Sequence, residues 1–183
     1  AALCAEHHPE RAAVVVVDPW TGDVIAMAGW PTFHPSDFGN VPEHIRRNMG
    51  FTECLEPGSS FKPFVAALAL ERGRVTPDTK FDCHNGVLRI GARTLHDVHG
   101  YGLLSVRDII AYSSNIGMAQ VGARLTPMEI YEGLRAFGFG SPTGIGLPGE
   151  TAGLLHHPNA WSKITISSIP MGQEVAVSPL QLA

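Results

Sequence analysis

The segment RAAVVVVDPWTGDVIAMAGW, residues 11–30, restricts the fold more than any other part of the chain. Residues 12–17 form a continuous apolar run rich in β-branched valine, which is typical of a strand covered on both faces. Residues 18–22 carry turn formers, and residues 24–28 predict a second strand. A lone two-stranded hairpin is marginally stable in water. We therefore expect further strands, supplied by a longer chain.

The composition is that of a globular protein. Hydrophobic residues make up 44% of the 183 residues and charged residues 16%, enough for one domain with a sizeable core. The formal net charge is −4 and no run of basic residues occurs, so nucleic acid is not an expected partner. No apolar stretch approaches the roughly 20 residues that span a bilayer. The first residues also lack the pattern of a signal peptide, although an anchor or export signal upstream is compatible with this sequence.

Neither the cysteines nor the histidines predict a metal site. Cys4, Cys54 and Cys83 cannot all pair within the chain, and their spacing fits no zinc pattern, so we expect free thiols. His96 and His99 could share a helix face, but no third ligand of obvious type lies near them. We expect no metal and no cofactor.

Several helices are predicted by their start and stop signals. The segment SFKPFVAALALERG is expected to be helical from about Ser59 and to end at Gly73. Residues 105–112 predict a helix capped by a serine, and Thr126-Pro127 opens another that runs to about residue 137. Further segments carry weaker signals: an irregular connection at 30–58, a small ribbon at 87–95, a helical stretch at 116–125 and a loop at 138–160.

The chain stops within a helix start. Ser178-Pro179 carries the signal of an N-cap followed by proline, and only about one helical turn follows it. Because such a short helix does not persist alone, we expect residues 1–183 to be part of a longer natural chain.

The segment EPGSSFKPF carries a candidate nucleophile. On a helix, positions i and i+3 share a face, so Ser59 and Lys62 are expected to meet. A serine needs a base within hydrogen-bond reach, and a buried lysine can lose its proton near neutral pH. The N–H groups of a helix start also favour an alkoxide and a developing oxyanion. The alternative is that Ser59 or Ser60 only caps the helix.

A second candidate element is Ser113-Ser114-Asn115, at the junction of two helical stretches. The Ser113 hydroxyl could relay a proton to a leaving amine, and the Asn115 carboxamide could hold a substrate amide through paired bonds. The alternative is again that these residues cap a helix.

Together these residues match a known family. Ser59-x-x-Lys62, followed about fifty residues later by Ser113-x-Asn115, resembles the serine penicillin-recognising enzymes, whose motif set is S-x-x-K, S-D-N and K-T-G. VVVDPWTGDVIAMAGWPTFHPSDF resembles the opening of the transpeptidase domain of class B penicillin-binding proteins, and MGQEVAVSPLQLA resembles a later helix start there. The resemblance runs in order from about residue 11 to the end.

The resemblance implies a fold and a domain. The fold is α/β of the α+β type, β-lactamase/transpeptidase-like, with an antiparallel sheet flanked by helices and with its C-terminal strands missing here. Residues 1–183 would be a partial penicillin-binding transpeptidase domain. It would hold a hairpin at about 12–28, an active-site helix from about residue 59 and an all-helical part at about 105–137.

The resemblance also implies a reaction. Ser59 would attack the carbonyl of a D-alanyl-D-alanine stem peptide, D-alanine would leave, and the amine of a second stem peptide would take the acyl group and cross-link peptidoglycan. β-Lactam antibiotics would trap Ser59 as a slow ester. Lys62 would be the base for acylation, Ser113 would carry the proton, and Asn115 would hold the substrate amide.

The third motif of the family is absent from residues 1–183. The lysines are Lys62, Lys80 and Lys163, and none is followed by Thr-Gly or Ser-Gly. We expect that motif beyond Ala183 and expect this piece alone to be a poor catalyst, since one oxyanion donor is worth about 10²–10³-fold in rate.

Other functions remain open at this point. Water as the acceptor would make the protein a D,D-carboxypeptidase or a β-lactamase-type hydrolase, and acylation without turnover would make it a non-catalytic β-lactam-binding or sensor domain. An unrelated α/β protein with chance motifs is the remaining alternative. The resemblance favours the transpeptidase.

Partners and location follow from the resemblance alone. It implies attachment to the bacterial cytoplasmic membrane with this domain on the outer side, although residues 1–183 by themselves are expected to be soluble. It also implies a glycosyltransferase and membrane proteins of the division or elongation machinery as partners.

Overall fold

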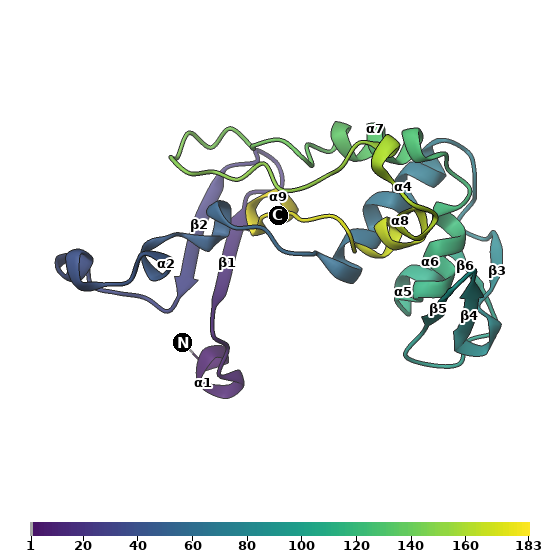
Figure 1. Ribbon diagram of the computed structural model, residues 1–183, viewed down its shortest axis with the longest axis horizontal. Helices are drawn as coiled ribbons and strands as arrows, with labels where there is room; N and C mark the ends of the chain where they lie inside the picture. Colours follow the sequence, from purple (N-terminus) through teal and green to yellow (C-terminus); the bar gives the residue numbers. More distant parts are fainter. Residues whose placement is uncertain (1) are drawn as a thin grey trace. The chain divides into compact units, whose positions relative to one another are not determined.

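The computed structural model describes residues 2–183, which form short helices and three small antiparallel sheets (Figure 1). The α-helices are α1 (Ala2–His7), α2 (Glu43–Arg46), α3 (Met49–Thr52), α4 (Lys62–Glu71), α5 (Val106–Ala111), α6 (Asn115–Gly122), α7 (Pro127–Ala136), α8 (Lys163–Ser168) and α9 (Pro179–Leu182). The strands are β1 (Ala12–Val17), β2 (Val24–Trp30), β3 (Lys80–Asp82), β4 (Val87–Ile90), β5 (Arg93–His96) and β6 (Leu103–Ser105). Short 3₁₀ helices lie between them: η1 (Pro35–Asn40), η2 (Gly58–Phe61), η3 (His84–Gly86), η4 (Pro158–Ala160) and η5 (Ile169–Met171).

The contacts divide the chain into two compact units. We call the first the hairpin unit; it comprises the residues up to 55 together with 138–154 and 177–183. The second, the helical unit, comprises residues 56–137 and 155–176. The expectation of a single partial domain with the boundaries given above stays a prediction.

The hairpin unit is built on β1 and β2. The two strands pair antiparallel, with Ala12 opposite Trp30 and an irregularity between Val16 and Val17. The prediction of a strand covered on both faces was wrong, because Val14 and Val16 are 56% and 43% exposed. Helices α3 and α9 pack against β1 but can cover only one of its faces, so alternate valines remain in contact with solvent.

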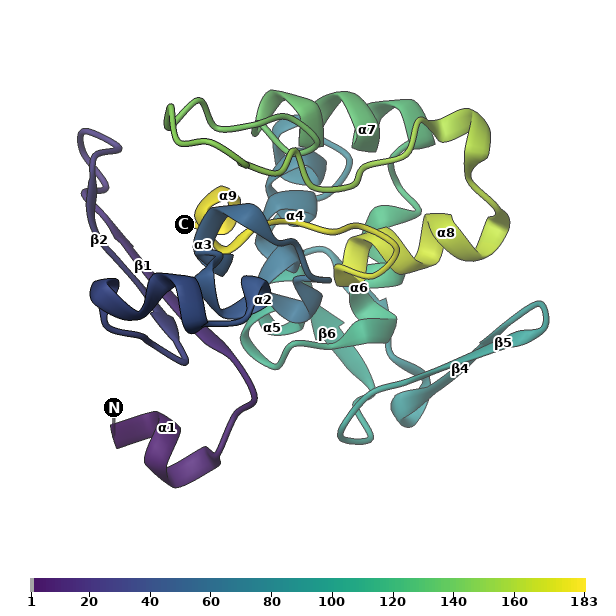
Figure 2. The same cartoon turned by 60° about the vertical axis from the view of Figure 1, so that its left-hand side comes forward.

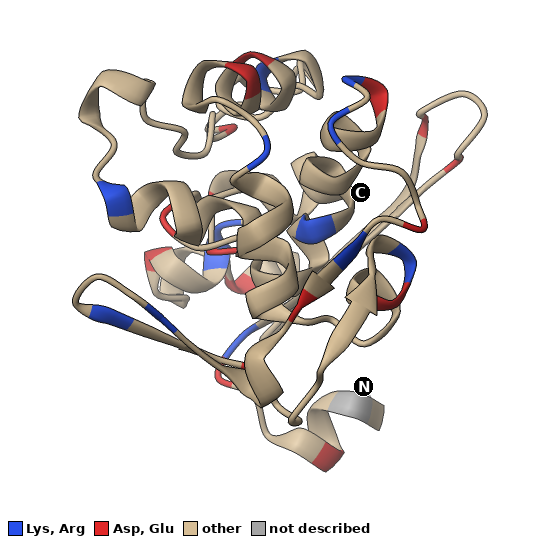
Figure 3. Ribbon diagram, turned by 90° about the vertical axis from the view of Figure 1, so that its right-hand side faces the viewer, with Lys and Arg blue, Asp and Glu red and all other residues tan. Residues whose placement is uncertain are grey.

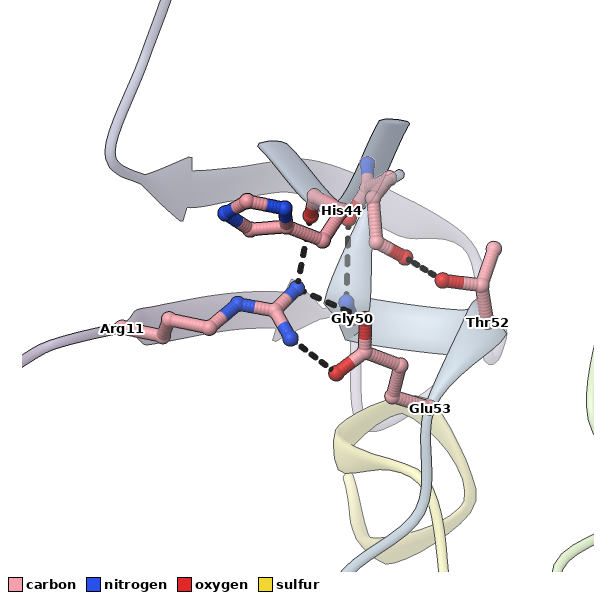
Figure 4. A network of polar contacts seen from close by, with 6 residues as sticks. Arg11, His44, Gly50, Thr52 and Glu53 are labelled. Carbon is pink, nitrogen blue, oxygen red and sulfur yellow. Dashed lines mark hydrogen bonds and ion pairs between the residues drawn. The ribbon is translucent and has the colours of Figure 1, made fainter. Parts of the chain in front are cut away.

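The connection after β2 is more ordered than the sequence indicated, since it contains η1, α2 and α3. A polar network ties it to the start of β1 (Figure 4). The Arg11 guanidinium donates to both carboxylate oxygens of Glu53 and, at 3.1 Å, to the carbonyl oxygen of His44. Asn48 caps α3 through the N–H of Gly50 at 3.0 Å. These side-chain hydrogen bonds order a segment whose sequence shows little periodicity.

The helical unit has α4 and α6 at its centre, where they contact each other. Nearly all residues of α6 are buried, so its sequence is apolar around most of its circumference. Helix α7 packs closely on α4 at Gly133. A Cβ atom added at this position would lie 2.3 Å from a methyl group of Leu68. A larger residue at position 133 would require the Leu68 side chain to move.

The predicted helix starts are confirmed by side-chain caps. Ser105 and Asp108 form a reciprocal capping box at α5, and Thr126 and Glu129 form another at α7. Ser178 starts α9 in the same way. Each box satisfies backbone N–H groups that the first turn leaves without partners.

Two small ribbons complete the helical unit: β3 pairs with β6, and β4 pairs with β5. The β4–β5 ribbon was predicted from VLRIGARTL, and Figure 2 shows it extending away from the helices of its unit. Within residues 2–183 no helix is both long and apolar enough to cross a membrane.

Candidate active site

Ser59 lies on a tight turn immediately before α4. The turn is the 3₁₀ helix η2, whose last N–H, that of Lys62, donates to the carbonyl oxygen of Ser59. The prediction that the helix begins here is confirmed, with the refinement that its first turn is 3₁₀ rather than α. A 3₁₀ helix has about three residues per turn, so residues i and i+3 lie on the same side.

The two adjacent serines have different surroundings. The hydroxyl of Ser60 donates to the carbonyl oxygen of Pro57 at 2.7 Å. The side chain of Ser59 is exposed, and among the described residues its hydroxyl has no hydrogen-bond partner and caps no helix. Of the two, only Ser59 has an exposed hydroxyl without a hydrogen-bond partner among the described residues.

The turn that carries Ser59 is hydrogen-bonded to residues 172–174, which lie more than a hundred positions later in the sequence. The N–H of Gly58 donates to the carbonyl oxygen of Gly172 at 3.0 Å. The Glu56 carboxylate accepts from the N–H of Glu174 at 2.7 Å. Gly172 has φ 76°, and a Cβ atom there would lie 2.1 Å from the carbonyl oxygen of Gly58. Glycine is therefore required at this position by both its backbone angle and its neighbour.

Lys62 is the buried cation of the site. It is the first residue of α4, and only 2% of it is exposed. Its Nζ donates to the carbonyl oxygen of Ser113 at 2.5 Å, to Ser113 Oγ at 3.0 Å and to Asn115 Oδ1 at 2.8 Å. The structure thus brings together three of the four residues predicted from the sequence.

Burial lowers the pKa of Lys62 from its ordinary value to about 8, while the charge of Asp97 opposes this shift. A fraction of the amine is therefore neutral at physiological pH. A neutral amine keeps two N–H donors and gains a lone pair, so it can retain two of its three hydrogen bonds and accept a proton. Among the described residues, the hydroxyl of the fourth residue, Ser59, makes no hydrogen bond to Nζ of Lys62 or to Ser113.

Ser113 lies in the left-handed region of backbone space, with φ 57°. This conformation is uncommon for a residue other than glycine and costs of the order of 1–3 kcal/mol. It occurs at the turn between α5 and α6, where both the carbonyl oxygen and the hydroxyl of Ser113 face Lys62. The following residue, Ser114, is the N-cap of α6 and accepts from the N–H of Gly117.

Asp97 organises this turn, and the sequence reasoning missed it. One carboxylate oxygen accepts from the N–H groups of Asn115 at 2.5 Å and Ile116 at 3.1 Å. The other accepts from the Ser114 hydroxyl at 2.6 Å. The carboxylate thus occupies the N–H groups that begin α6. The only signal available in the sequence was an acidic residue within LHDVHGYG, a segment considered for its histidines alone.

The amide of Asn115 is oriented at both ends. Its Oδ1 accepts from Lys62, and its Nδ2 donates to the carbonyl oxygen of His96 at 3.0 Å. An asparagine side chain has two donors and two lone pairs. One donor and one acceptor therefore remain for a substrate amide, which presents the complementary pair.

Comparison with known proteins agrees with this arrangement. Residues 12–183 match the family model described as the penicillin binding protein transpeptidase domain. The chain therefore belongs to that family. This result, the S-x-x-K and S-x-N residues at the site and the mixed fold confirm the family that the sequence indicated.

Individual relatives are similar over nearly the whole chain. The chain is 39% identical over 179 residues to the "Probable peptidoglycan D,D-transpeptidase PenA" of Neisseria flavescens. The match covers 98% of this chain and 44% of that protein. It is 34% identical to the "Peptidoglycan D,D-transpeptidase FtsI" of Escherichia coli K12, covering 95% of this chain and 29% of that protein. The chain thus spans less than half the length of these relatives.

Solved structures share the fold. The apo transpeptidase domain of penicillin-binding protein 3 from Burkholderia pseudomallei matches with a TM-score of 0.87 and 32% identity, over 99% of this chain and 50% of that one. A structure described as a peptidoglycan glycosyltransferase from Burkholderia ambifaria matches with a TM-score of 0.89 and 33% identity, over 100% of this chain and 54% of that one.

Proposed function

We propose that the protein is a serine-type peptidoglycan D,D-transpeptidase that acts through an acyl-enzyme on Ser59. The observation that carries the proposal is the convergence of the buried Lys62 amine on Ser113 Oγ and Asn115 Oδ1, within 3.0 Å of each. Buried structural lysines are usually paired with a carboxylate. An amine surrounded by a hydroxyl, a carboxamide and a carbonyl is suited to passing protons.

The proposed acylation begins with neutral Lys62. As the Ser59 oxygen attacks the carbonyl carbon of the penultimate D-alanine, its proton passes to Lys62. The tetrahedral intermediate collapses when the C–N bond breaks, and the proton reaches the leaving D-alanine amine through the Ser113 hydroxyl. The free donor and acceptor of Asn115 hold the amide of the stem peptide in register.

Deacylation uses the same groups in reverse. The amine of a second stem peptide loses its proton through Ser113, attacks the ester carbonyl, and Ser59 leaves with a proton returned by Lys62. The product is a peptide cross-link. A Lys-Thr-Gly strand, which family membership implies, would bind the substrate carboxylate and contribute one oxyanion-hole N–H.

The substrate class, partners and location are part of the same proposal. Stem peptides ending in D-alanyl-D-alanine are the donor, and β-lactams acylate Ser59 in their place. The names of the relatives support a role in peptidoglycan synthesis. The domain would work on the outer side of the bacterial cytoplasmic membrane beside a glycosyltransferase of the division or elongation machinery.

Labelling the full-length protein with a fluorescent penicillin tests the proposal. Wild type should form a stoichiometric ester that survives denaturation, Ser59→Ala should not label, and the neighbouring Ser60→Ala should label at close to the wild-type rate. Mass spectrometry should place the adduct on the peptide that contains Ser59. Absence of labelling in the wild type would overturn the enzymatic proposal, and rapid release of the label as hydrolysed drug would favour a hydrolase.

A further inference from the structure

A cavity of about 330 Å³ lies between the end of the β4–β5 ribbon and the start of α8. It is lined by Ile90, Ala92 and Ile164, together with Arg93 and Lys163. We call it the ribbon notch. All of these residues belong to the helical unit, and none is among the residues placed in the candidate active site.

The apolar walls of the notch are open to solvent. Ile90 is 38% exposed and Ile164 is 48% exposed, on two elements far apart in sequence. Figure 2 shows that the ribbon projects from its unit rather than packing along it. Two isoleucines flanking a half-open cavity form an apolar surface that a further side chain could cover.

The rim of the notch is basic. Arg93 and Lys163 line it. Among the described residues neither of these two forms a salt bridge, and the lining contains no aspartate or glutamate. Figure 3 colours the charged positions of the ribbon blue, and its sequence between Val87 and His96 contains no acidic residue.

Arg93 is held by two hydrogen bonds and is not paired with a carboxylate among the described residues. Its guanidinium donates to the hydroxyl of Ser168 and, at 2.8 Å, to the side-chain oxygen of Gln173. Both partners are neutral, so the positive charge stays available to an external carboxylate. A cation that is already fixed loses little conformational entropy on binding.

We propose that the ribbon notch is a docking site for an acidic segment of a partner protein, with one aliphatic or aromatic side chain seated between Ile90 and Ile164. The volume is at the lower end of the roughly 300–1,000 Å³ of ligand pockets, which suits one or two side chains. Carboxylates beside that side chain meet Arg93 and Lys163. A peptide supplies such an anchor with adjacent charges, whereas a flat bilayer does not enter a cavity.

A random peptide library displayed on phage and selected on the full-length protein tests the proposal. We expect the enriched sequences to combine aspartate or glutamate with leucine, isoleucine or phenylalanine. A synthetic peptide of the enriched sequence, followed by fluorescence anisotropy, should bind Ile164→Glu and Lys163→Glu at least roughly tenfold and fivefold more weakly than wild type. Ile25→Glu is the matched control, since Ile25 is 67% exposed on β2 and lies outside the notch.

Three outcomes would overturn the proposal. The first is no enrichment, or enrichment of basic sequences. The second is equal binding of the selected peptide to wild type and Ile164→Glu, with unfolding temperatures showing that both are folded. The third is binding to phosphatidylglycerol-containing vesicles that is lost in Ile164→Glu while no peptide is enriched, which would assign the surface to a membrane. Penicillin labelling of Ser59 is a separate measurement, so failure here leaves the proposed function untouched.

Discussion

The Nζ atom of Lys62 lies 3.0 Å from Oγ of Ser113, although the two residues are 51 positions apart in the sequence. This contact joins the helix that carries the serine turn to the turn between α5 and α6. In the proposed reaction this amine takes part in two proton transfers, from the attacking Ser59 hydroxyl and toward the leaving amine. The protonation state of Lys62 is therefore expected to control the rate of acylation.

Acylation should become faster as the pH rises through about 8. Lys62 accepts a proton only when neutral, and burial lowers its pKa to about 8, so the neutral fraction increases up to and beyond that pH. The measurement is the rate of fluorescent-penicillin labelling of full-length protein between roughly pH 6.5 and 9.5. Lys62→Arg should label at least ~10²-fold more slowly, because a guanidinium stays protonated. A flat profile in wild type would contradict the role of Lys62 as base.

Replacing Asp97 should change both the rate and its pH dependence. The charge of Asp97 raises the pKa of Lys62, so Asp97→Asn should move the inflection of the labelling profile to lower pH. Asp97→Ala also removes the acceptor for the N–H groups of Asn115 and Ile116 and should slow labelling by roughly ten- to a hundredfold.

Asp37→Asn provides the control for this experiment, because Asp37 is exposed in η1 of the hairpin unit. Its profile should match that of wild type. If Asp97→Asn lowered the rate equally at every pH without moving the inflection, Asp97 would act on structure alone.

Gly172→Ala should disable the serine turn. Its Cβ atom would lie 2.1 Å from the carbonyl oxygen of Gly58, so one of the two segments must move. We expect labelling to fall by at least roughly tenfold, because an error of about 1 Å in a catalytic group can cost 10²-fold. Gly73→Ala distinguishes backbone strain from the steric clash with Gly58. Gly73 has a similar φ of 62°, but no atom lies within 4 Å of a Cβ added there. Equal labelling of the two variants would show that the contact with Gly58 is unimportant.

The ion pair between Arg11 and Glu53 should stabilise the hairpin unit measurably. Both side chains are about 30% exposed, and the guanidinium donates to both carboxylate oxygens. A cycle of Arg11→Ala, Glu53→Ala and the double variant should give a coupling of about 1 kcal/mol in the free energy of unfolding, above the median for surface pairs. The Glu43–Arg47 pair on α2 is more exposed and should give less. Equal couplings would show that the bidentate geometry adds nothing.

Local signals in the sequence predicted local structure well. The helix starts at Ser105, Thr126 and Ser178 depend on side chains that bond within three residues, and all three occur as expected. The spacing of Ser59 and Lys62 likewise placed both on one turn. Such features can be predicted from the sequence because the interacting residues lie within a few positions of each other.

Features that depend on distant residues were not predictable. Asp97 acts on a turn 17 or more residues later, and the requirement for glycine at position 172 arises from the backbone of Gly58. The burial of residues 12–17 was overestimated because a valine-rich strand indicates a sheet but not which of its faces will be covered. The left-handed backbone of Ser113 gave no signal, since serine is not a residue that marks such angles.

The bonds from Gly58 to Gly172 and from Glu56 to Glu174 also set an order of events during biosynthesis. The second of them closes a loop of 118 positions, so it cannot form until residue 174 has been synthesised. Contacts of such long range are made late in folding, because the entropy of closing the loop must be overcome first. We therefore expect the turn that carries the proposed nucleophile to be completed after helices such as α5 and α7, whose capping boxes are local.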